Sequence, residues 1–197
     1  PSLRGQRTFA ILQAVIEELG RDAAAEVAGF RVAHYSVQHD HVHLIVEATD
    51  GQRLSSGARK LVIRVARRFQ EKLGWPGRLW GDRYHRRDLT TPSEGRNALV
   101  YVLQNVKKHA GLDRDVEMTD PCSSGPWFEG WAKPIGLAPL RDSPVARPRT
   151  WLLATGWTLL GLLRFDEAPA APRRRVVARA LTQSPRSRRR RPRETGQ

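Results

Sequence analysis

A pair of histidines one residue apart, inside an apolar run that ends at Val46, most limits what this chain can fold into. Side chains of a β-strand point alternately to its two faces, so His41 and His43 are predicted to share one face. Val42, Leu44 and Val46 then share the other face and can join a core. Two imidazoles on one stiff strand can clamp a single metal ion. The segment therefore predicts a half-buried strand that carries a candidate metal site.

The segments around the histidine pair predict further regular structure. Phe30–Val37 reads as a strand, and the link of residues 38–40 is short enough to form a hairpin with the strand His41–Ala48. Upstream, Thr8–Val27 has apolar residues at three- and four-residue steps, which predicts a helix. A second helix is expected from about Leu54 to a stop at residues 74–77.

Basic residues gather on this second helix and on the extended stretch Arg78–Leu89 that follows it. On the helix they are either a solvated face or a surface for the DNA backbone. The candidates for DNA contact in these two segments are Arg59, Lys60, Arg64, Arg67, Arg83, Arg86 and Arg87. Trp75, Trp80 and Tyr84 could stack unpaired bases, although Trp80 could equally belong to the core.

The third predicted helix has the clearest start. Thr91 as N-cap, proline at the first helical position and Glu94 form a capping box, and the helix is expected to reach about His109. Tyr101 lies roughly 150° from the centre of the buried stripe at about 100° per residue, so packing explains it poorly. Asn105, four residues on, shares its face. The DNA-contact candidates near the end of this helix are Lys107 and Lys108.

The composition limits which partners the protein is expected to bind and which cellular compartment it suits. The chain has 197 residues and a formal net charge of +14, and ten arginines with one glutamate place +9 of that charge in residues 172–197. Such a surface favours polyanions. We expect a domain over residues 1–112, an extension packed on it over 113–171, and a disordered Arg-rich tail over 172–197. The single cysteine, Cys122, excludes an internal disulfide and fits a reducing cytoplasm. The expected location is the cytoplasm, in association with the nucleoid. The apolar run 151–163 is too short to span a bilayer.

Three segments in this order resemble a known family. His-Val-His-Leu-Ile-Val-Glu (41–47), Asp-Arg-Tyr-His-Arg-Arg (82–87) and the run 91–105, which holds Tyr101 and Asn105, are similar to the REP-associated tyrosine transposases. These belong to the single-tyrosine HUH transposases of bacterial insertion sequences. The resemblance is strong from Arg31 to His109 and weaker through residues 120–124 and 149–153.

The resemblance implies an α+β, ferredoxin-like fold: an antiparallel sheet with helices on one face, followed by a helix that carries the nucleophile. It implies that His41, His43 and Asn105 bind Mg²⁺ or Mn²⁺, and that Tyr101 attacks single-stranded hairpin DNA to form a 5′-phosphotyrosine. Repetitive extragenic palindromes are the expected substrates. Tyr84 is a rival nucleophile, for which a structural or DNA-contact role is preferred. Both a homodimer and a monomer remain open.

Two departures from the family pattern stand out. The family's fold opens with a central strand, whereas this sequence passes from residues 1–7 straight into a helix, so we expect the first strand to be absent and the strand of His41 to lack a neighbour. Asp40 stands where the family has asparagine, and it could coordinate the metal or shape the turn. Three residues are expected around the site, either in supporting contacts or as ordinary surface and packing groups: Asp40, His85 and Asn97.

Two alternatives to an active transposase stay open. One is a non-catalytic DNA-binding remnant that keeps the fold and the basic surface. The other is a ferredoxin-like RNA-binding module, which would need paired exposed aromatics on its strands. The strands Phe30–Val37 and His41–Ala48 lack such pairs, so the RNA-binding alternative is the weaker one.

Overall fold

The computed structural model describes residues 2–24, 29–81, 83–105, 118–136, 139–167 and 178–179. The regular elements, in chain order, are α1 (Gln6–Ala24), β1 (Phe30–Val37), β2 (His41–Ala48), α2 (Gly51–Leu73), α3 (Pro92–Leu103), the 3₁₀ turn η1 (Gly125–Trp127), α5 (Trp151–Ala154), the 3₁₀ turn η2 (Gly156–Leu160) and β3 (Ala178–Arg179). The expected α+β class with an antiparallel sheet is confirmed. No helix in the described ranges is long and apolar enough to cross a membrane.

The sheet is built around the hairpin of β1 and β2. The two strands pair antiparallel from Phe30 opposite Ala48 to Val37 opposite Val42, with an irregularity between Val32 and His34. The three residues 38–40 join them, and the N–H of Gln38 closes this link by donating to the carbonyl of His41 at 2.8 Å. The strand order is β1-β2-β3.

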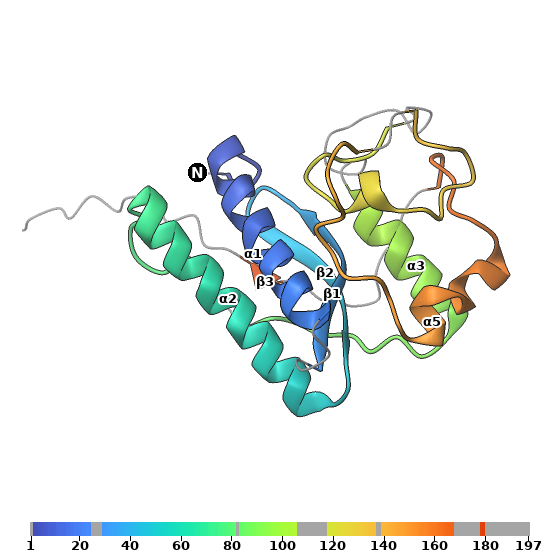
Figure 1. Ribbon diagram of the computed structural model, residues 1–197, viewed down its shortest axis with the longest axis horizontal. Helices are drawn as coiled ribbons and strands as arrows, with labels where there is room; N and C mark the ends of the chain where they lie inside the picture. Colours follow the sequence, from blue (N-terminus) through green and yellow to red (C-terminus); the bar gives the residue numbers. More distant parts are fainter. Residues whose placement is uncertain are drawn as a thin grey trace, which may run out of the picture.

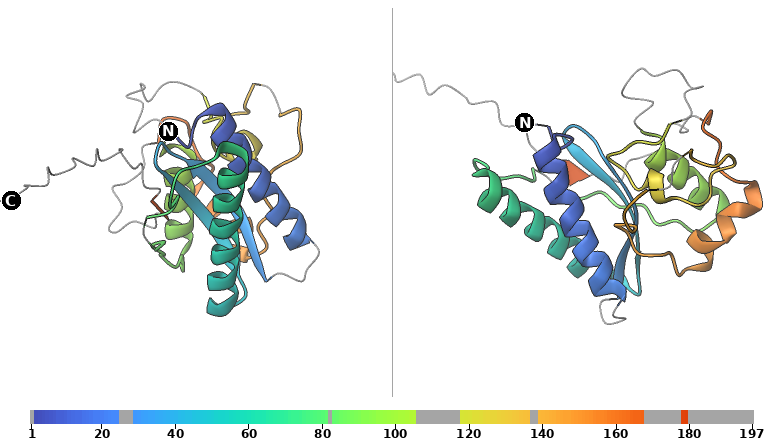
Figure 2. Two further views of the ribbon diagram at one scale, coloured as in Figure 1. Left: turned by 90° about the vertical axis from the view of Figure 1, so that its left-hand side faces the viewer. Right: turned by 45° about the horizontal axis from the view of Figure 1, so that its top comes forward.

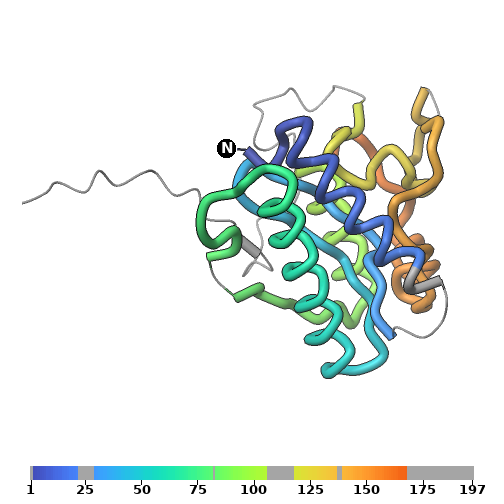
Figure 3. Tube along the Cα trace, turned by 60° about the vertical axis from the view of Figure 1, so that its left-hand side comes forward, coloured from blue at the N-terminus to red at the C-terminus, as the bar shows by residue number. Residues whose placement is uncertain are grey.

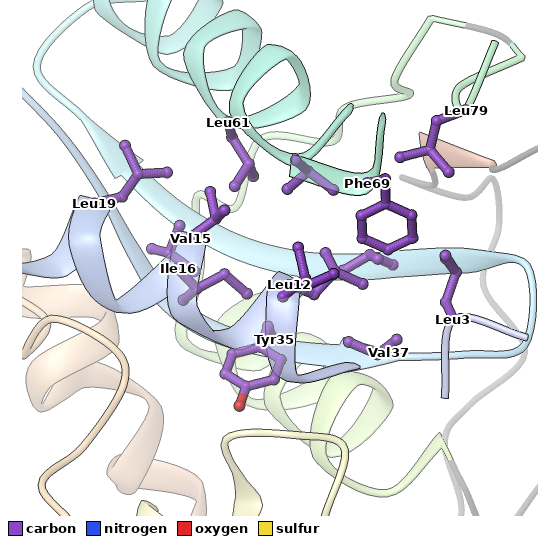
Figure 4. Close-up of a cluster of buried hydrophobic side chains, with 14 of the residues drawn as sticks. Leu3, Leu12, Val15, Ile16, Leu19, Tyr35, Val37, Leu61, Phe69 and Leu79 are labelled. Atoms are coloured by element: carbon purple, nitrogen blue, oxygen red, sulfur yellow. The ribbon is translucent and has the colours of Figure 1, made fainter. Parts of the chain in front are cut away.

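Helices cover the two faces of this sheet unequally. In Figures 1 and 2, α1 and α2 lie together on one face, and α3 lies on the other with the chain that leads to α5. Figure 3 shows α1 and α2 running side by side. The first core fills the space between these two helices and the sheet, and Figure 4 shows α1 inserting its apolar side chains there. Its fully buried members include Val15, Tyr35 and Phe69.

The ends of α2 follow from local chemistry. Asp50 caps its start by accepting the N–H of Arg53 at 2.7 Å, and Gly74 ends it with φ of 57°, a left-handed conformation that glycine adopts without strain. Near the first turns, Gly57 lies directly against the ring of Phe30, where an added Cβ would be 2.1 Å from Cγ. Glycine therefore sets the close approach of α2 to β1.

Both edges of the hairpin have neighbours. The outer edge of β1 is covered by residues 122–124, since Val37 N–H donates to the Cys122 carbonyl at 2.8 Å and Ser124 N–H donates to the Tyr35 carbonyl at 3.0 Å. The outer edge of β2 meets β3, with His41 opposite Arg179. Within 172–197, predicted as a disordered tail, the structure describes only Ala178–Arg179. Those two residues supply a neighbour that the strand of His41 was expected to lack.

Burial of His34 on β1 predicts acid lability. His34 lies against Ser124, with Nδ1 and Oγ 3.3 Å apart, and burial lowers its pKa from 6.5 to about 4. The folded chain therefore keeps this ring neutral while the unfolded chain protonates it below pH 6.5. The unfolding free energy should fall as pH drops from 6.5 to 4, by roughly 3 kcal/mol in all.

Urea unfolding at pH 7.5, 5.5 and 4.5 checks this loss. His34→Gln should flatten the pH dependence in that window, whereas His39→Gln, on the exposed side of the turn, should leave it as in the parent. An unchanged slope in His34→Gln would show that other groups cause the lability.

Candidate metal and tyrosine site

β2 places the two histidines on the face that looks toward α3. Val42 belongs to the core under α1 and α2, where Leu44 and Val46 also pack, while Ile45 belongs to the core of α3. The alternation predicted for this strand is therefore confirmed. His43 is buried, with 2% of its surface exposed. Its Nε2 lies 3.0 Å from Nε2 of His41, so the two ring nitrogens face each other.

Asp40 contacts the opposite nitrogen of His41. Oδ1 of Asp40 lies 2.7 Å from Nδ1 of that ring. A carboxylate can only accept, so the hydrogen of a neutral His41 sits on Nδ1 and leaves a lone pair on Nε2. Asp40 thus contacts the side of the His41 ring that faces away from His43.

Tyr101 reaches the same site from α3. Its hydroxyl lies 3.5 Å from Nε2 of His43, and the two rings meet edge to face with centroids 4.9 Å apart. Tyr101 is half-buried at the border of the α3 core, whose deepest members on this helix are Leu99 and Leu103. The structure therefore brings together three residues that the sequence separates by up to sixty positions.

The end of α3 differs from the prediction. The helix stops at Leu103, and Gln104 leaves helical geometry with φ of −113° and ψ of 11°. The side chain of Gln104 is buried and donates through Nε2 to the Arg164 carbonyl at 2.6 Å, a contact that ties it to the later chain. Asn105 is again helical, so one residue outside helical geometry separates it from the helix of Tyr101, and residues 106–109 of the predicted helix lie outside the described residues.

Asn105 keeps one property expected of a ligand. It is fully buried, and neither its Oδ1 nor its Nδ2 has a hydrogen-bond partner among the described residues. A buried amide without a partner costs stability, so these two atoms need a partner that the described residues do not supply.

These donors fit a divalent cation. Two imidazole nitrogens bound at right angles to one octahedral ion, with bonds of about 2.1 Å, lie about 3 Å apart, which matches the Nε2 pair of His41 and His43. Among the described residues, no group of three or more His, Cys, Asp or Glu side chains could hold a metal ion. The amide oxygen of Asn105 is the expected third donor.

The other residues expected around the site lie at the surface. His85 is exposed in the extended segment before α3, and Asn97 is exposed on α3, one turn before Tyr101. Neither shares the buried surroundings of His43, so the structure favours the surface alternative for both.

The basic residues do not form one surface with the site. Arg59, Lys60 and Arg67 are on the outer side of α2, on the face of the sheet opposite to α3 (Figure 1). Arg64 is half-buried on the same helix. Three further DNA-contact candidates, Arg83, Arg86 and Arg87, are exposed in the segment between α2 and α3. Arg87 pairs with Glu94 at 2.7 Å and Arg86 with Asp88 at 3.7 Å. Lys107 and Lys108 lie outside the described residues.

Glu47 is a buried carboxylate to which the sequence assigns no role. It is buried on β2, and its carboxylate accepts the N–H of Arg149 at 2.9 Å and both the N–H and the hydroxyl of Thr150, at 2.8 and 2.6 Å. Thr150 is the N-cap of α5. Glu47 thereby holds α5 against the histidine face. Glu47 is an even number of residues from His41 and His43 on the same strand, so alternation of side chains alone would have assigned it to their face.

Comparison with known proteins gives the family. A family model described as "Transposase IS200 like" matches residues 6–102, a range that runs from the start of α1 to the residue after Tyr101. No curated protein and no solved structure matches the chain significantly. Through residues 6–102, the chain belongs to the IS200-like transposase family.

Proposed function

We propose that this DNA transposase cleaves and rejoins single-stranded hairpin DNA, with Tyr101 as nucleophile and a divalent metal held by His41, His43 and Asn105. One observation carries the proposal: Nε2 of His43 lies 3.0 Å from Nε2 of His41 and 3.5 Å from the hydroxyl of Tyr101. A tyrosine hydroxyl beside two imidazole nitrogens that could hold a metal ion suits nucleophilic attack on a phosphodiester. Repetitive extragenic palindromes are the proposed substrates.

The reaction is a transesterification. The Oη of Tyr101 attacks the scissile phosphorus, the bond from phosphorus to the 3′ oxygen breaks, and a 5′-phosphotyrosine and a free 3′-hydroxyl result. The phenol gives up its proton, and the leaving 3′ oxygen takes one up. Attack by a 3′-hydroxyl on the phosphotyrosine reverses these bond changes, so the strands rejoin without ATP.

The side chains around the tyrosine have distinct tasks. A phenol with a pKa near 10 is a weak nucleophile at neutral pH. A bound Mg²⁺ or Mn²⁺ would polarise the phosphate and offset its developing charge. His41 and His43 would hold that ion, and the edge-to-face contact with His43 orients the ring of Tyr101.

A cleavage assay tests the proposal. The full chain is incubated with a single-stranded hairpin from its own genomic flanks, labelled at the 3′ end in one sample and at the 5′ end in another. With Mn²⁺, the 3′ label should enter a protein-linked band in a denaturing gel, and the 5′ label should mark a shorter free strand. EDTA should abolish both products. Salt-dependent binding without either product would instead favour the DNA-binding remnant.

A further inference from the structure

Asp40 is placed to act on His41 and not on the metal itself. Its Oδ1 lies 2.7 Å from Nδ1 of His41, and the ring directs its Nε2 away from that contact, toward Nε2 of His43. The carboxylate oxygen that holds Nδ1 is therefore on the wrong side of the ring to reach an ion between the two Nε2 atoms.

The turn does not depend on this side-chain contact. A backbone hydrogen bond from Gln38 to the His41 carbonyl closes it, and the N–H of Leu3 donates to the His39 carbonyl within it, each at 2.8 Å. Neither bond involves the carboxylate of Asp40. The observed Asp40–His41 contact thus adds something other than turn closure.

We propose that Asp40 is a positioning residue that fixes the tautomer of His41, so that Nε2 carries the lone pair before any metal arrives. This inference rests on the proposed function for the metal, but the tautomer itself is a property of the metal-free chain. A carboxylate behind a ligating histidine orients the ring and makes its free nitrogen a better donor, and loss of such a partner weakens metal binding by about 10- to 100-fold.

Two variants and one control test the proposal in the full-length protein. Asp40→Ala removes the acceptor. Asp40→Asn keeps an oxygen that can accept the Nδ1 hydrogen but removes the negative charge. Asp88→Asn removes the same charge from an exposed pair with Arg86 and serves as the matched control. Mn²⁺ affinity is measured by titration calorimetry, and the imidazole tautomers are read by ¹⁵N NMR after treatment with EDTA.

Asp40→Ala should bind Mn²⁺ about 10- to 100-fold more weakly and should lose the pure Nδ1–H tautomer of His41. Asp40→Asn should keep that tautomer and lose less affinity, and Asp88→Asn should match the parent. The proposal is overturned if His41 keeps the Nδ1–H tautomer in Asp40→Ala. It is also overturned if Asp40→Ala and Asp40→Asn lose Mn²⁺ affinity equally while His41 keeps its tautomer. That result would mark Asp40 as a direct ligand of the metal. A parent chain that binds no Mn²⁺ would refute the metal in the proposed function, while the metal-free spectra would still decide the role of Asp40.

Discussion

Replacing Tyr101 with phenylalanine should abolish the covalent protein–DNA band and slow strand cleavage by about 1,000-fold or more. The substitution removes only the hydroxyl that lies 3.5 Å from Nε2 of His43, and the ring can keep its edge-to-face contact with that histidine. Folding and Mn²⁺ binding should therefore stay close to those of the parent, which separates loss of the nucleophile from loss of the site. Thermal unfolding and calorimetry on the same variant measure both.

Tyr84→Phe is the matched control for this experiment. Tyr84 is the rival nucleophile, is 38% exposed, and belongs to the extended segment before α3 instead of the histidine face. Its variant should form the covalent band at the parental rate. Retention of the band in Tyr101→Phe together with its loss in Tyr84→Phe would contradict the assignment of Tyr101.

Local pattern was enough to predict the hairpin. The bounds of β1 and β2 agree with those expected, because alternation of side chains and a short turn are properties of neighbouring residues. The same alternation assigned His41 and His43 to one face before any contact was known. Helix geometry placed Tyr101 away from the buried stripe, but the structure packs it partly against the core of α3 as well as beside His43.

Contacts between distant segments explain what the sequence did not reveal. The break at Gln104 accompanies its hydrogen bond to Arg164, sixty residues later, so the helical period could not predict it. The sequence correctly predicted that basic residues gather on one face of α2. How far this face lies from the histidines depends on which side of the sheet α2 covers. That side is decided by where Leu61, Val65 and Phe69 are buried, which is a property of the whole fold.

Removing the carboxylate of Asp120 should destabilise the chain by about 3 kcal/mol, since it would leave a partly buried guanidinium without its counter-charge. Asp120 is 1% exposed and accepts from both terminal nitrogens of Arg4, at 2.8 and 2.7 Å, and from the N–H of Cys122 at 2.9 Å. Arg4 also donates to the Val37 carbonyl at 2.7 Å. The pair therefore joins the N-terminal residues and the loop at 120–124 to the last residue of β1.

Urea unfolding of Asp120→Ala at pH 7.5 measures the loss, and Asp88→Ala is the control. Asp88 forms an exposed pair with Arg86, and such pairs contribute about 1 kcal/mol or less. Val37 lies directly before the turn that carries Asp40 and leads to His41, so loosening its anchor should also weaken Mn²⁺ binding, which the control should leave unchanged. Stability within about 0.5 kcal/mol of the parent would contradict the anchoring role. Lower stability with parental Mn²⁺ affinity would confine the role of Asp120 to the fold, because the histidine pair would then hold its geometry without the N-terminal residues.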